Sequence, residues 1–86
     1  MDGPTSALET LAAALGTDAY AITLTRGDRP HLTVTNRLVP RLSESVREHD
    51  GWFWWGWAER IAPIGEIGRA VHTVTAVLGV AEHSRG

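Results

Sequence analysis

The residues with the clearest chemical potential are aromatic and fall in one short stretch, GWFWWGW at positions 51–57. This stretch holds every tryptophan and phenylalanine of the chain: Trp52, Phe53, Trp54, Trp55 and Trp57. Each ring can bury roughly 150–250 Å² of surface, and an exposed indole can stack on a sugar or a nucleobase. Because the side chains of a strand alternate between two faces, such a run is aromatic on both. One face can enter a core, and the other must meet a partner, a ligand or water.

Residues for catalysis or metal binding are present but are not spaced to act together. No two histidines have the i, i+4 spacing that places two metal ligands on one helix face. His31 and His49 could approach each other across a sheet and form a metal or acid–base site, but a strand residue and a turn residue are the simpler interpretation. Alternation places Ser43 and Ser45 away from Glu44, and no nucleophile elbow or phosphate loop is present. We therefore expect no enzyme activity, metal ion or cofactor.

Charge patterning argues against polyanionic partners. The eight basic side chains are all arginine, and with ten acidic residues they give a net charge of −2. An aspartate dilutes a modest cluster of arginines around a predicted hairpin, at Arg26, Arg29, Arg37 and Arg41. The balance does not favour nucleic acid or an anionic membrane. Arg26-Gly27-Asp28 matches the integrin adhesion tripeptide, but we interpret it as ordinary turn chemistry.

Composition sets the class of protein. A chain of 86 residues, with 43% hydrophobic and 21% charged side chains, has the composition of one folded domain spanning residues 1–86. The absence of cysteine excludes disulfides and thiolate metal sites. Arginine without lysine, with abundant Ala, Gly and Val, indicates a GC-rich bacterial genome. The N-terminus lacks the basic region of a signal peptide, and no apolar run approaches the roughly 20 residues that span a bilayer, so we expect a cytoplasmic protein.

Two helices are predicted at the ends of the domain. Ser6 and Glu9 have capping-box spacing before a helix at 6–16, which Gly16 can end in a left-handed cap. Its apolar stripe is Leu8, Leu11, Ala12 and Leu15. A second helix is predicted from Pro63 to Leu78, with a proline in the first turn. Its stripe is Ile64, Ile67, Val71, Val74 and Leu78. We expect residues 1–5 and 80–86 to be flexible.

Strands occupy the middle of the chain. Residues 20–25 and 31–36 alternate regularly and predict a hairpin with one aliphatic and one threonine-rich face. A third strand is predicted at 42–48 and a fourth at 52–57, after a turn at 49–51. The fold class is therefore α+β, with three or four antiparallel strands and both helices on one face (α-β-β-β-β-α). We expect the core to include Leu11, Ile22, Val34, Ile67 and Val71.

The aromatic run must divide between the two faces of its strand. Phe53 has no polar atom, whereas each indole N–H needs a partner or water, so we expect Phe53, Trp55 and Trp57 to point into the core. Trp52 and Trp54 would then stand on the outer face, away from the helices. Gly56 beside them would leave backbone open to close approach, and a one-residue bulge would invert the assignment.

The predicted function is a small non-enzymatic protein–protein interaction module: an adaptor, a chaperone-like protein or a regulatory accessory protein. Its partner is a second copy of the chain, in a homodimer, or another protein. The binding residues on the outer face are Trp52, Trp54, Thr23, Thr25, His31, Thr33 and Thr35. Pairing through an open sheet edge is a second route. The alternative function is a small-ligand-binding domain that stacks a sugar or a nucleotide on exposed tryptophan.

Overall fold

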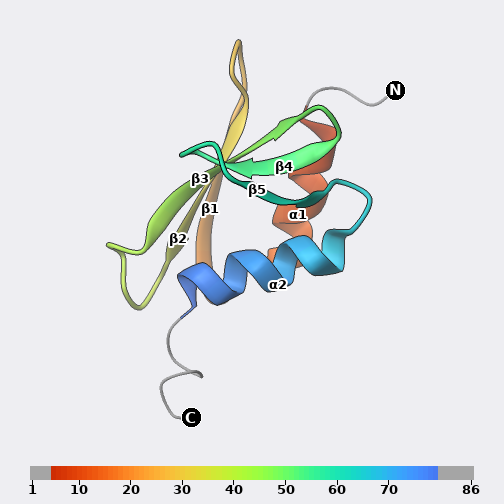
Figure 1. The fold of residues 1–86 in the computed structure, drawn as a ribbon. Coiled ribbons are helices and arrows are strands. Elements are labelled where there is room, and N and C mark those ends of the chain that lie inside the picture. The colour runs from red at the N-terminus through yellow and green to blue at the C-terminus, as the bar shows by residue number, and fades with distance from the viewer. Residues whose placement is uncertain (1–4, 80–86) are drawn as a thin grey trace.

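A computed structural model of the chain describes residues 5–79 and shows a helix, five strands and a second helix (Figure 1). The elements are α1 (Ser6–Leu15), β1 (Tyr20–Thr25), β2 (His31–Asn36), β3 (Ser43–His49), β4 (Trp52–Trp55), β5 (Arg60–Pro63) and α2 (Ile67–Leu78). The strands form one antiparallel meander in the order β1-β2-β3-β4-β5. The predicted α+β class with terminal helices is confirmed, and the sheet gains a fifth strand. Except for Thr5, the predicted flexible ends lie outside the described residues.

The turn between β3 and β4 determines which aromatic side chains point toward the helices. His49 pairs with Trp52, so only Asp50 and Gly51 connect the two strands. Both have positive φ angles, 58° and 78°. This is the backbone of a tight hairpin turn, for which Asp-Gly is a preferred sequence because glycine tolerates the second position. The two-residue connection fixes the register of β4 and therefore the direction of each ring.

Both helices pack against one face of the sheet and against each other (Figure 1). The core between these layers holds Leu8 and Leu11 of α1, inward residues of all five strands, and Ala70, Val74 and Leu78 of α2. The described elements leave the opposite, outer face of the sheet without a covering layer. Strand residues pointing to that face are half-buried by their neighbours or exposed.

Three of the five predicted core residues are less buried than we expected. Leu11 and Val34 have no exposed surface, but Ile22, Ile67 and Val71 are only partly buried. Ile22 lies on β1, an edge strand with no neighbour on its far side. In α2 the buried positions are Ala70, Val74 and Leu78, so the helix is rotated and Ile67 and Val71 flank its contact stripe.

The second helix begins later than predicted, because residues 60–63 form β5 instead of its first turn. Pro63 ends this strand and pairs with Trp52. An edge strand tolerates proline, since the missing N–H removes no bond from a central ladder. Ile64 therefore lies outside α2, and the helix starts at Ile67.

The predicted capping box at the start of α1 does not form. Thr5 is the N-cap residue, and no side chain caps the helix. Glu9 is engaged elsewhere: it accepts a 3.3 Å hydrogen bond from the Thr5 hydroxyl and pairs with Arg26 at 2.9 Å. Gly16 does end the helix, with a positive φ of 76° and its N–H bonded to Ala12, but its ψ of 174° is not that of a left-handed cap.

Asn36 is a buried polar residue that joins three parts of the fold. Its Oδ1 accepts hydrogen bonds from the backbone N–H groups of Leu38 and Val39, at 2.8 and 3.0 Å. Its Nδ2 donates to the Leu78 carbonyl at 2.7 Å. The carbonyls of a last helical turn have no partner within the helix. One side chain thus satisfies the end of α2 and shapes the loop after β2.

Candidate functional site

The aromatic residues of β4 divide between the two faces as the alternation predicts. Phe53 and Trp55 lie in the core with exposed fractions of 0% and 3%. Trp52 and Trp54 point to the outer face and are half-buried there. The sequence-based assignment of these four rings is therefore confirmed.

The prediction that Trp57 enters the core is wrong, because its side chain is 49% exposed. Strand β4 ends at Trp55, and the chain then turns with Ala58 at a φ of 71°. In this loop the Trp57 ring stacks on Trp55, with centroids 4.9 Å apart and planes 7° apart. Its indole N–H donates to Glu59 at 2.8 Å. Trp57 covers the edge of the core from outside.

All seven residues predicted to bind a partner lie on the outer face. Direct cross-strand pairs join Thr23 to Thr33 and Thr25 to His31 on β1 and β2. Thr35 pairs with Ser43 of β3, and their hydroxyls are 2.7 Å apart. Strand β3 separates this threonine-rich part from the tryptophans of β4. The outer face therefore has a hydroxyl-rich half and an aromatic half.

Arg60 of β5 connects the two outward tryptophans. Its Cζ atom lies 4.8 Å from the ring centroid of Trp52 and 5.5 Å from that of Trp54. The Trp54 indole N–H donates to the His49 carbonyl at 2.9 Å, and the His49 ring lies 6.4 Å from the indole. A guanidinium against an aromatic face is attractive. The rings are thus held in place, and part of their stacking surface is already in use.

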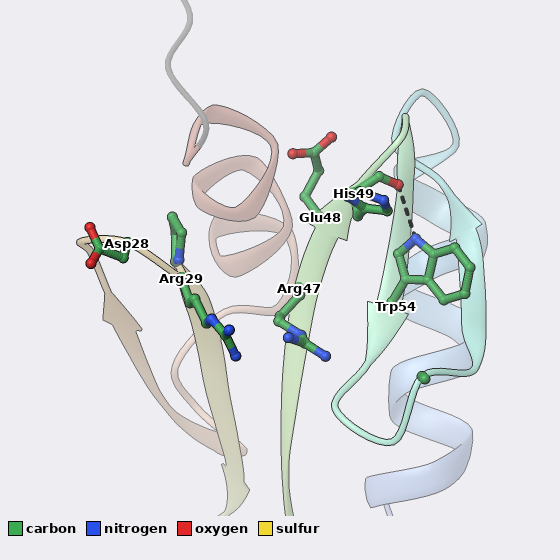
Figure 2. A pocket seen from close by; sticks show the side chains of 8 residues that line it. Asp28, Arg29, Arg47, Glu48, His49 and Trp54 are labelled. Carbon is green, nitrogen blue, oxygen red and sulfur yellow. Dashed lines mark hydrogen bonds between the residues drawn. The ribbon is translucent and has the colours of Figure 1, made fainter.

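Two neighbouring hollows open beside this aromatic cluster, with volumes of about 460 and 290 Å³. Arg29 and Arg47 line both hollows. Trp54 and His49 line the larger one, and His31, Ser45 and Gly56 line the smaller. Figure 2 shows both guanidinium groups on the same side of the sheet, while the carboxylates of Asp28 and Glu48 point away from them. The two arginines form the boundary between the hollows.

The arginines of the hollows make no ion pair within residues 5–79. The ion pairs in this part of the chain join Arg26 to Glu9 and Arg69 to Glu66. Neither guanidinium at the hollows donates a hydrogen bond to any described residue; Arg29 takes part only through its backbone carbonyl, 3.0 Å from His31 Nδ1. No strand position that points to the outer face carries a carboxylate. The outer face is locally basic although the chain is acidic overall.

The arginine cluster predicted from the sequence does not assemble. Arg26 is paired with Glu9, and Arg37 donates to the Thr17 carbonyl at 2.9 Å. Residues 37–41 follow β2, whereas Arg29 precedes it, so these arginines lie at opposite ends of the strand. Sequence reasoning instead missed Arg47 and Arg60. Alternation around Val46 could have indicated that Arg47 points to the outer face. Arg60 could not be placed there without strand β5, which was not predicted.

Within residues 5–79 no three His, Cys, Asp or Glu side chains come together as metal ligands. His31 and His49 line different hollows, and the ring contact of His49 in the described chain is with Trp54 and not with His31. No helix of the described chain is long and apolar enough to cross a membrane. No protein family, curated protein or solved structure matches the chain.

Proposed function

We propose that this chain is a non-enzymatic interaction module whose outer sheet face binds a protein partner. The observation that carries the proposal is the pair of half-buried tryptophans, held by Arg60, on a face that no described element covers. Tryptophan and arginine dominate the binding energy of many protein interfaces. Aromatic groups that are already fixed lose little conformational entropy when a partner binds.

The charge of the face favours another protein over a second copy. Arg47 and Arg60 point outward and Arg29 stands at the rim, without a carboxylate at the outward strand positions. A two-fold axis through the tryptophans would bring the arginines of both copies together, which is unfavourable. A complementary partner therefore presents an acidic surface.

The alternative, stacking of a sugar or nucleotide, has less support. Arg60 lies over both outward rings, so one face of each indole is already occupied. Binding sites of this kind need an accessible ring face. Trp54 is the only tryptophan that lines the nearby hollows, and it shares the larger one with the charged side chains of Asp28, Arg29, Arg47 and Glu48.

A selection of peptides from a random library on the purified chain tests the proposal. Selected peptides should compete with one another, and Trp54→Ala should weaken their binding by roughly thirtyfold or more, because an aromatic anchor is lost. Trp57→Ala is the matched control, since this exposed tryptophan stacks on the inward-facing Trp55 and lines neither hollow. Failure to select competing peptides, or equal binding to Trp54→Ala and wild type, would contradict the proposal.

A further inference from the structure

Arg29 and Arg47 bring two guanidinium groups to one place on the outer face, and neither is ion-paired within residues 5–79. Both line the same two hollows, and Figure 2 shows their guanidinium groups on the same side of the sheet. No described carboxylate pairs with either one. Adjacent like charges repel, and an anion placed between them removes that repulsion while accepting their hydrogen bonds. The pair therefore has the properties of an anion-binding site.

We propose that Arg29 and Arg47 bind a carboxylate of an acidic segment in the protein partner, with Trp54 packing beside it. This inference rests on the proposed function and specifies the chemistry of the partner. Guanidinium groups present planar, paired N–H donors that match the two oxygens of a carboxylate. The partner's carboxylate lies between the arginines at the junction of the two hollows.

The two hollows suit the neighbours of such a carboxylate. On one side, the larger hollow offers the Trp54 ring, against which an apolar side chain can pack. On the other side, the smaller hollow is lined by Ser45 and Gly56, which have no large side chain. The Gly56 N–H donates to the Ser45 carbonyl at 2.9 Å, and a Cβ at Gly56 would lie 3.3 Å from that of Ser45. A side chain at position 56 would therefore crowd Ser45, and glycine leaves this hollow open to the partner.

The surroundings of the pair favour a carboxylate over a nucleic acid. Asp28 and Glu48 line the larger hollow, and the whole chain carries a net charge of −2. A nucleic acid carries charge along its whole length and brings several phosphates near these carboxylates, whereas a short acidic segment can place one carboxylate between the arginines. Single-stranded nucleic acid also requires a continuous basic groove, and these arginines make one discrete site.

The experiment is a titration followed by NMR, using an acetylated tetra-aspartate peptide as the probe. The tetra-asparagine peptide is its uncharged counterpart, and inorganic phosphate and an eight-residue oligothymidylate test other anions. The signals to follow are the Trp54 indole N–H and the Arg47 amide, both at the larger hollow. Arg29→Gln and Arg47→Gln remove the site. Arg41→Gln, exposed in the loop after β2, removes the same charge elsewhere.

We expect tetra-aspartate to shift both signals in a saturable way and tetra-asparagine to leave them unchanged. Each hollow variant should weaken this binding by about tenfold, because a charge-assisted hydrogen bond is lost, and Arg41→Gln should not. All three variants should keep the wild-type unfolding midpoint.

Three results would overturn the assignment: equal shifts with tetra-asparagine, equal weakening by Arg41→Gln, or tighter binding of phosphate or oligothymidylate. The inference can also fail while the proposed function holds. Peptides selected on the outer face would then lose binding in Trp54→Ala but bind Arg47→Gln as tightly as wild type.

Discussion

Strand β4 places the same kind of side chain in two different environments. Its inward residues, Phe53 and Trp55, have almost no exposed surface and pack among aliphatic side chains under the helices. Its outward residues, Trp52 and Trp54, are half-buried beside a guanidinium and a histidine. Neighbouring residues of a strand point to opposite faces, so the inward and outward rings alternate along β4. The inward pair serves stability, and we attribute partner binding to the outward pair.

The difference also explains how so small a domain carries so much aromatic surface. The inward rings add large apolar side chains to the core, to which the two short helices contribute only a few buried residues. The outward rings avoid the cost of full exposure because Arg60 and the His49 carbonyl partner them. The indole N–H lets each ring remain in contact with water, and the apolar ring surface can pack against a partner. The predictions that follow separate these two roles.

Trp55→Ala should have the largest effect on folding. The change opens a cavity in the core and removes the ring on which Trp57 stacks. We expect the free energy of unfolding to fall by about 3–5 kcal/mol, measured by urea denaturation. Trp52→Ala on the other face of the strand is the control and should cost much less. If the two variants lose equal stability, the division of β4 into two roles is wrong.

Asn36→Ala should have the next largest effect. The variant leaves the Leu78 carbonyl and two loop N–H groups without their partner. We expect a loss of about 2–3 kcal/mol, with faster hydrogen exchange of the Leu38 and Val39 amides. Thr35→Ala, a neighbouring change on the outer face, should cost under about 1 kcal/mol. A loss that small for Asn36→Ala would show that water replaces these hydrogen bonds.

Trp57→Ala should have a moderate effect on stability and none on peptide binding. The ring is half exposed and contributes mainly its stack on Trp55 and one hydrogen bond to Glu59. We expect a loss of about 1 kcal/mol. Trp57→Phe should recover part of it, because the stack remains. A cost as large as that of Trp55→Ala would place Trp57 in the core after all.

Arg60→Gln should have the smallest effect. It removes the guanidinium from both outward rings, and contacts of this kind at exposed sites contribute about 0.5–1 kcal/mol. The near-ultraviolet circular dichroism of the tryptophans should change more than the unfolding midpoint. Arg69→Gln, at an exposed pair on α2, is the control and should leave that spectrum unchanged.

The sequence predicts the regular parts of this fold well. The alternation of residues 20–25 and 31–36 and the Asp50-Gly51 turn are local signals in the sequence. The structure has the two strands and the tight turn that these signals predict. The turn fixes the register of β4, so the direction of its four rings could be predicted from alternation and the chemistry of phenylalanine. The prediction failed where regular geometry ends, because alternation has no meaning for Trp57 in a loop.

The remaining misses have a physical cause in tertiary structure. Strand β5 has four residues, too few for a periodic signal in the sequence. Its last residue is a proline, which in the sequence resembles the start of a helix. Arg60 could not be placed without that strand. The hollows depend on Arg29 from a loop and Arg47 from β3, which come together only when β2 and β3 pair. That proximity has no counterpart in the spacing of the sequence.

The most direct test of the central claim is the affinity of Trp54→Ala for a peptide selected on the wild-type chain. Isothermal titration should be carried out at a temperature where urea denaturation shows the variant to be fully folded. We predict that binding weakens by about 2 kcal/mol or more while Trp57→Ala binds like wild type. Unchanged affinity in folded Trp54→Ala would contradict the assignment of the outer face as the binding surface.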